Sequence, residues 1–149
     1  MLSERQIDLI RQSWQRLDGE RPALAARFYG RFFAIAPYAR SLFDSDLAAQ
    51  ARKLAETLDF LVSHLDDAPA RAEAVRALAR RHAGYGVVPA NYAPVSEAMI
   101  WTLDRVFEPP LDTATRDAWL LAVHELTRQM RREAEASPAP AAARDGDLP

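Results

Sequence analysis

Apolar side chains recur at helical spacing along most of this 149-residue chain, whereas the sequence signals of β-structure are missing. Ile7, Ile10, Trp14 and Leu17, for example, form one apolar stripe at the spacing of an amphipathic helix. No run of alternating β-branched residues occurs, and no Asn-Gly or Asp-Gly turn joins two apolar runs. The sequence therefore predicts an all-α fold, either a helix bundle or a packing of crossed helices.

Capping and breaking residues divide the apolar pattern into six or seven helices with short connections. Ser3 and Gln6 have the spacing of a capping box, and Pro37 interrupts the pattern before a short segment over 38–43. The sequence predicts longer helices that begin at or just after Ser3, Pro22, Asp46, Ala70, Pro94 and Asp112 or Thr113. The helix after Asp46 is expected to run to about residue 65, where Asp66 to Pro69 break it.

Composition excludes several classes of protein. The 19 basic and 21 acidic residues give a net charge of −2, without the basic surplus of a nucleic-acid-binding domain. The absence of cysteine excludes disulfides and thiolate chemistry. No apolar run approaches the ~18 residues of a membrane span, and no secretory signal opens the sequence. We expect a cytoplasmic protein without nucleic-acid or membrane partners, with one domain over 1–136 and a disordered Pro- and Ala-rich tail over 137–149.

Of the three histidines, His82 has the most informative surroundings. It lies near the end of a predicted helix, on the same face as Val75 and Leu78. A single helical histidine is more often structural than a metal ligand, but an imidazole on such an apolar face suits the axial position of a haem. The second ring nitrogen then needs an acceptor, and the carbonyl of Leu78, four residues earlier, is free near a helix end.

The chain also indicates what faces His82. If the two helices that meet near Ala68 run back against each other, Leu54 lies opposite His82 and Gln50 lies one turn earlier on the same face. Both are candidates to face a flat ligand. His64 is only four positions from the corner, roughly 15 Å along the helix axis from the level of His82, and is a poor second ligand.

Several motifs recur in the order of a known family over about residues 2–135. They are Phe28-Tyr29, Phe32-Phe33, Pro37 to Leu42-Phe43, Gln50 to Leu54, Arg80-Arg81-His82, Tyr85 to Val88, Asn91-Tyr92 and Asp117-Ala118-Trp119. This order resembles bacterial single-domain globins. It is similar to the Vitreoscilla-type haemoglobins, to the haem domain of flavohaemoglobins and most closely to the Hell's Gate type of globin. The resemblance implies a globin fold of six to eight helices around a haem b, with a short or absent D helix.

The resemblance also implies a role for each candidate site residue. His82 matches the proximal iron ligand, Phe43 the ring that stacks on the haem, and Leu54 the apolar residue beside the gas. Tyr29 and Gln50 match the distal polar pair. The other implied haem contacts are Lys53 and Arg81 at the propionates, and Leu78, Val87 and Tyr92. In flavohaemoglobins the tyrosine that matches Tyr92 joins the proximal histidine and a glutamate, but here the glutamate position falls on Ala134, between Glu133 and Glu135.

The distal pair predicts a preference for O₂. A tyrosine hydroxyl and a glutamine amide are both donors, and an O₂ ligand of ferrous haem carries partial negative charge. Each such hydrogen bond contributes ~1.5–3 kcal/mol, so two bonds in the lower part of this range correspond to on the order of 10²–10³ in O₂ affinity. Bound CO carries less charge than bound O₂, so hydrogen bonds from these donors stabilise it less.

We therefore expect reversible, high-affinity O₂ binding, with CO and NO as further ligands. A nitric oxide dioxygenase is an alternative. We expect it to need a separate flavin reductase, because no nucleotide-binding motif follows a strand in this sequence. A gas sensor and a haem-free helical bundle also stay open.

Overall fold

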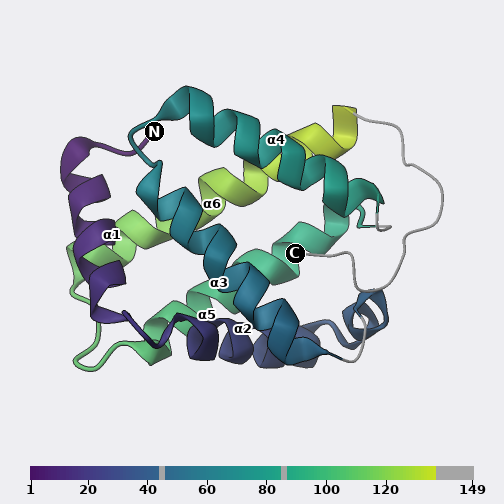
Figure 1. Ribbon diagram of the computed structural model, residues 1–149, viewed down its shortest axis with the longest axis horizontal. Helices are drawn as coiled ribbons and strands as arrows, with labels where there is room; N and C mark the ends of the chain where they lie inside the picture. The colour runs from purple at the N-terminus through teal and green to yellow at the C-terminus, as the bar shows by residue number, and fades with distance from the viewer. Residues whose placement is uncertain (44–45, 85–86, 137–149) are drawn as a thin grey trace.

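The computed structural model describes residues 1–43, 46–84 and 87–136, and these form α-helices and short 3₁₀ helices without a strand (Figure 1). The predicted all-α class is confirmed. Tyr85, Gly86 and the tail over 137–149 lie outside the described residues. In chain order the elements are α1 (Glu4–Arg16), α2 (Arg21–Ile35), η1 (Pro37–Leu42), α3 (Leu47–Ser63), α4 (Ala68–Gly84), η2 (Pro89–Asn91), α5 (Tyr92–Val106) and α6 (Thr113–Ala136).

The predicted helix starts are set by local capping. The Gln6 backbone donates to Ser3 Oγ at 3.1 Å, and the Ser3 backbone donates to Gln6 Oε1 at 2.8 Å, which confirms the capping box. Asp46 and Asp112 each accept a hydrogen bond from the backbone three residues on, at 3.0 and 2.8 Å. Carboxylate caps of this kind satisfy N–H groups that a helix cannot pair internally.

Three predicted boundaries differ from the structure by two residues. α4 begins at Ala68 and α5 at Tyr92, in each case two residues earlier than the sequence predicted. Pro69 and Pro94 therefore lie inside the first turn, where a helix needs no donor from the backbone nitrogen. α3 ends at Ser63 rather than at residue 65.

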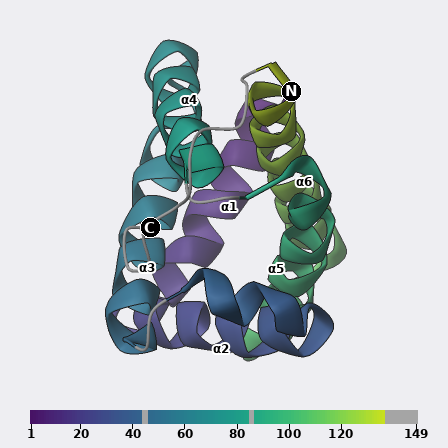
Figure 2. The same cartoon turned by 90° about the vertical axis from the view of Figure 1, so that its right-hand side faces the viewer.

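The helices form two sides joined at one end by α2. The most extensive contacts of α2 are with α3 and α5, while α6 packs on α1, α4 and α5. Figure 2 shows α2 across one end, with α3 and α4 on one side and α5 and α6 on the other. α3 and α4 run in opposite directions but splay apart from their common corner (Figure 1), and they share few contacts. Leu54 on α3 and His82 on α4 were predicted to lie opposite each other, but the two helices do not pack directly against each other there.

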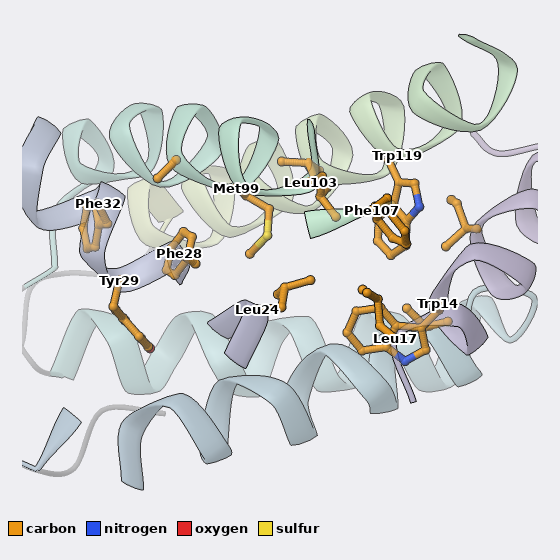
Figure 3. Packing of buried hydrophobic residues seen from close by; sticks show 14 of the residues in the cluster. Trp14, Leu17, Leu24, Phe28, Tyr29, Phe32, Met99, Leu103, Phe107 and Trp119 are labelled. Carbon is orange, nitrogen blue, oxygen red and sulfur yellow. The ribbon is translucent and has the colours of Figure 1, made fainter. Parts of the chain in front are cut away.

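Aromatic and aliphatic side chains from α1, α2, α3, α5 and α6 fill the core (Figure 3). Trp14 of α1 and Trp119 of α6 lie with ring centroids 5.9 Å apart. Next to this pair is a mostly apolar cavity of about 140 Å³, whose lining includes Leu58, Val75 and Met99. The predicted stripe of α1 is buried along its length, as the periodicity required.

One buried hydrogen bond joins side chains of α6 and α1. The indole Nε1 of Trp119 donates to Ser13 Oγ at 2.8 Å, and both side chains are buried. Changing Ser13 to alanine would leave this indole N–H without its acceptor, and we expect a loss of about 1–3 kcal/mol in the free energy of unfolding. Urea denaturation measures it.

The matched control is Ser63→Ala. Ser63 is exposed and its hydroxyl donates only within its own helix, to the Asp59 carbonyl at 2.8 Å. We expect its effect to stay within about 0.5 kcal/mol. Equal losses in both variants would show that the Trp119–Ser13 bond adds nothing to stability.

Candidate functional site

The packing of α2 against α3 brings Tyr29 and Gln50 together. Each side chain is only 5% exposed, and Gln50 Nε2 donates to Tyr29 Oη at 3.3 Å. The Tyr29 oxygen is the acceptor in this bond, so the bond to Gln50 does not use the hydroxyl hydrogen of Tyr29. Burial raises the pKa of the Tyr29 hydroxyl well above its ordinary value, so the group stays protonated and can donate. Burial therefore keeps both Tyr29 and Gln50 away from the surface of the protein.

Apolar groups surround this polar pair. Phe43 directly follows η1, and its ring lies edge-on to Tyr29 at 5.4 Å and to Phe33 at 5.4 Å. Leu54 lies one turn after Gln50 on α3 and packs against the main core. The structure thus brings Tyr29, Phe43 and Gln50 to one region, with Leu54 next along the same helix.

On α4, the ring of His82 has one nitrogen committed and one available. Nδ1 lies 2.8 Å from the backbone oxygen of Leu78. A carbonyl can only accept, so Nδ1 carries the proton and Nε2 keeps its lone pair. Burial lowers the pKa of His82 and the charge of Arg81 adds to this, while the Leu78 carbonyl opposes them. A neutral imidazole with a free Nε2 is the form that binds a metal.

The chain after α4 returns close to His82. The Val87 backbone donates to the His82 carbonyl at 3.1 Å. The ring of Tyr92, buried at the start of α5, lies 6.5 Å from the His82 ring at an interplanar angle of 39°. Burial raises the pKa of the Tyr92 hydroxyl to about 12.

The hydroxyl of Tyr92 finds no hydrogen-bond partner in the part of the chain that the structure describes. Ala134 packs against the cluster of buried residues that includes Leu78 and Tyr92. The position that matches the glutamate of flavohaemoglobins therefore holds an alanine next to this cluster.

The remaining candidates lie at the surface. Lys53 on α3 and Arg81 on α4 are both exposed. His64 lies just past the end of α3, where its ring stacks on Phe60 at 4.1 Å and its Nδ1 contacts the Phe60 carbonyl at 2.8 Å. Gln50 is at the opposite end of α3, which agrees with the expectation that His64 is remote from a distal site. His124 on α6 is exposed.

The sequence matches the model of the globin family over residues 26–130, and the chain therefore belongs to the globin family. Among its relatives is a neuroglobin of Danio rerio, 27% identical over 152 residues that span 90% of this chain and 96% of that protein. A neuroglobin of Chaenocephalus aceratus is also 27% identical, over 80% of this chain and 84% of its own length. A flavohemoprotein of Vibrio cholerae is 26% identical over 82% of this chain, a match that spans only 32% of that longer protein.

The family match confirms the predicted globin fold, and family membership implies haem binding. Neuroglobins and a flavohemoprotein match at nearly equal identity, so the bacterial single-domain type stays a prediction. The donor set fits a haem: one neutral imidazole with a free nitrogen on α4, and two buried hydrogen-bonding groups on α2 and α3. Among the described residues, no helix has the length and apolarity to cross a membrane.

Proposed function

We propose that this protein binds haem b through His82 and takes up O₂ reversibly and with high affinity, within a globin domain over residues 1–136. The observation that carries the proposal is the buried hydrogen-bonded pair of Tyr29 and Gln50, at 3.3 Å, on helices other than that of His82. Two buried donors in an otherwise apolar region have a clear use if a polar ligand binds there.

The α4 side would hold the cofactor. When bound, haem supplies a ferrous iron that takes up O₂, CO or NO as a ligand. His82 would ligate the iron through Nε2, while the hydrogen bond from Nδ1 to the Leu78 carbonyl fixes the tautomer and the ring plane. Phe43, Leu54, Val87 and Tyr92 would provide apolar contacts, and Lys53 and Arg81 would meet the propionates at the surface.

The α2–α3 side would select the gas. The Tyr29 hydroxyl and the Gln50 amide would donate to O₂ held there with partial negative charge, and each such bond would contribute ~1.5–3 kcal/mol. CO carries less charge, so the same donors stabilise it less. The rings of Phe33 and Phe43 beside Tyr29 keep water from competing for these donors.

The absorption spectrum of the purified, reduced protein before and after addition of CO tests the proposal. We expect a five-coordinate haem spectrum that shifts when CO binds, with His82 as the protein ligand of the iron. A six-coordinate reduced spectrum would mean that a second side chain occupies the gas position. A protein that takes up no haem at all would overturn the proposal.

The flavohemoprotein relative favours a second candidate, nitric oxide dioxygenase activity with nitrate as product. The same Tyr29 and Gln50 donors would hold O₂ for reaction with NO. Turnover would then need electrons from a flavin reductase, and the match to this relative spans 32% of its length. Sustained NO consumption with NADH and a flavin reductase would support this activity, whereas a single stoichiometric reaction would favour O₂ binding or gas sensing.

A further inference from the structure

A groove of about 540 Å³ lies between α5 and α6. These two helices pack against each other on one side of the molecule (Figure 2). The polar lining of the groove comes from Tyr92, Ser96 and Glu97 on α5 and from His124, Thr127, Arg128 and Arg131 on α6. Only Tyr92 belongs to the candidate haem site, so the groove is a separate feature of the fold.

Two residues that line the groove carry buried hydroxyl groups without a partner among the described residues. Tyr92 is 3% exposed and Ser96 is 8% exposed. Neither hydroxyl forms a hydrogen bond with any described residue. The two residues are four positions apart on α5, so they lie on the same face of the helix. Nearly all buried polar side-chain atoms in proteins have a partner, and two unsatisfied donors one turn apart indicate an acceptor that the chain itself does not supply.

The rim of the groove is cationic. Arg128 and Arg131 are exposed on α6, three positions apart, and neither forms an ion pair or hydrogen bond with a residue in the described ranges. Among the described residues, Glu97 is the only carboxylate that lines the groove, and it forms no ion pair with either arginine. The two guanidinium groups therefore outnumber the acidic groups of the lining, and His124 stands one turn before Arg128.

We propose that this groove binds a small organic oxyanion, through a phosphate or carboxylate group. Guanidinium groups form paired, charge-assisted hydrogen bonds with both kinds of oxyanion, which assigns recognition to Arg128 and Arg131. The hydroxyls of Tyr92 and Ser96 supply neutral donors from below. Both hydroxyl oxygens are buried, so side chains of the lining must shift for these contacts to form. The volume of the groove lies in the range of small-molecule sites and exceeds that of a bare ion.

Titration of the purified full-length protein with inorganic phosphate and with citrate, followed by NMR of the backbone amides, tests the site. The ionic strength is held constant with chloride. We expect saturable shifts that cluster on α5 and α6 around the groove. The stronger of the two probes identifies the head group that the site prefers. The absence of saturable shifts with both probes, or equal shifts with chloride alone, would overturn the proposal.

Charge-matched variants separate the site from general attraction of anions. Loss of a charge-assisted pair in Arg131→Gln should weaken binding about tenfold. Arg132→Gln, which removes the same charge from the neighbouring exposed position outside the lining, should leave affinity within about twofold. Ser96→Ala should weaken binding several-fold without loss of thermal stability, because it removes an unsatisfied hydroxyl. Equal losses in Arg131→Gln and Arg132→Gln would contradict the proposal.

Discussion

The His82→Gly variant is expected to lose most of its bound haem, and added imidazole is expected to restore the haem spectrum. The substitution removes the free Nε2 on α4, together with the Nδ1 contact to the Leu78 carbonyl at 2.8 Å. Loss of a ligand itself should exceed the roughly 10–100-fold effect of losing a supporting partner. Free imidazole can enter the space left by the ring and supply the same nitrogen. The ratio of haem absorbance to protein concentration measures the effect.

His64→Gly is the matched control for this experiment. His64 lies just past the end of α3, a position where glycine is well tolerated. Its imidazole stacks on Phe60, remote from the Tyr29–Gln50 pair at the other end of the helix. Haem content should stay at the wild-type level in this variant. Unchanged haem content in His82→Gly would instead show that His82 is not the ligand.

The second large effect is expected at Tyr29. In Tyr29→Phe the hydroxyl is lost while the ring keeps its contacts with Phe33 and Phe43. Removal of one hydrogen bond of ~1.5–3 kcal/mol should speed O₂ release by about 10–100-fold. CO release should change by only a few-fold, because CO gains little from a donor. Stopped-flow replacement of each gas measures both rates.

Tyr38→Phe provides a control of the same chemistry at the surface. Tyr38 is 57% exposed, and its hydroxyl accepts a hydrogen bond from Asn91 at 3.4 Å. Both gas dissociation rates should stay unchanged in this variant. If Tyr29→Phe accelerated O₂ and CO release by the same factor, the hydrogen-bond explanation of O₂ selectivity would fail and a general change of the pocket would replace it.

Local interactions explain why much of the fold was predictable from the sequence. The capping box at Ser3 and Gln6 joins residues three positions apart, and the contact of His82 with the Leu78 carbonyl joins residues four apart. Such contacts follow from helical geometry alone. The start of α4 was harder to predict because Pro69 is compatible both with a break before a helix and with its first turn.

Contacts between residues that are far apart in the sequence were harder to predict. Tyr29 and Gln50 are 21 residues apart, and only the packing of α2 on α3 brings them into hydrogen-bond contact. The family resemblance supplied this pair; periodicity did not. The groove on α5 and α6 was not predicted from the sequence, because Arg128 and Arg131 lie in what looks like an ordinary charged helix end. The sequence around them on α6 does not indicate that the buried hydroxyls of Tyr92 and Ser96, on α5, lack partners among the described residues.

The apolar cavity beside the Trp14–Trp119 pair bears on how the protein responds to hydrostatic pressure. Its lining is mostly apolar and includes Leu58, Val75 and Met99, and imperfectly packed space of this kind, here about 140 Å³, is lost when a chain unfolds into water. Complete loss would correspond to roughly 80 mL/mol, toward the upper end of the range of about 20–100 mL/mol seen for proteins. Compression should therefore favour the unfolded chain strongly, and any apolar guest that fills the cavity should make the folded chain harder to compress.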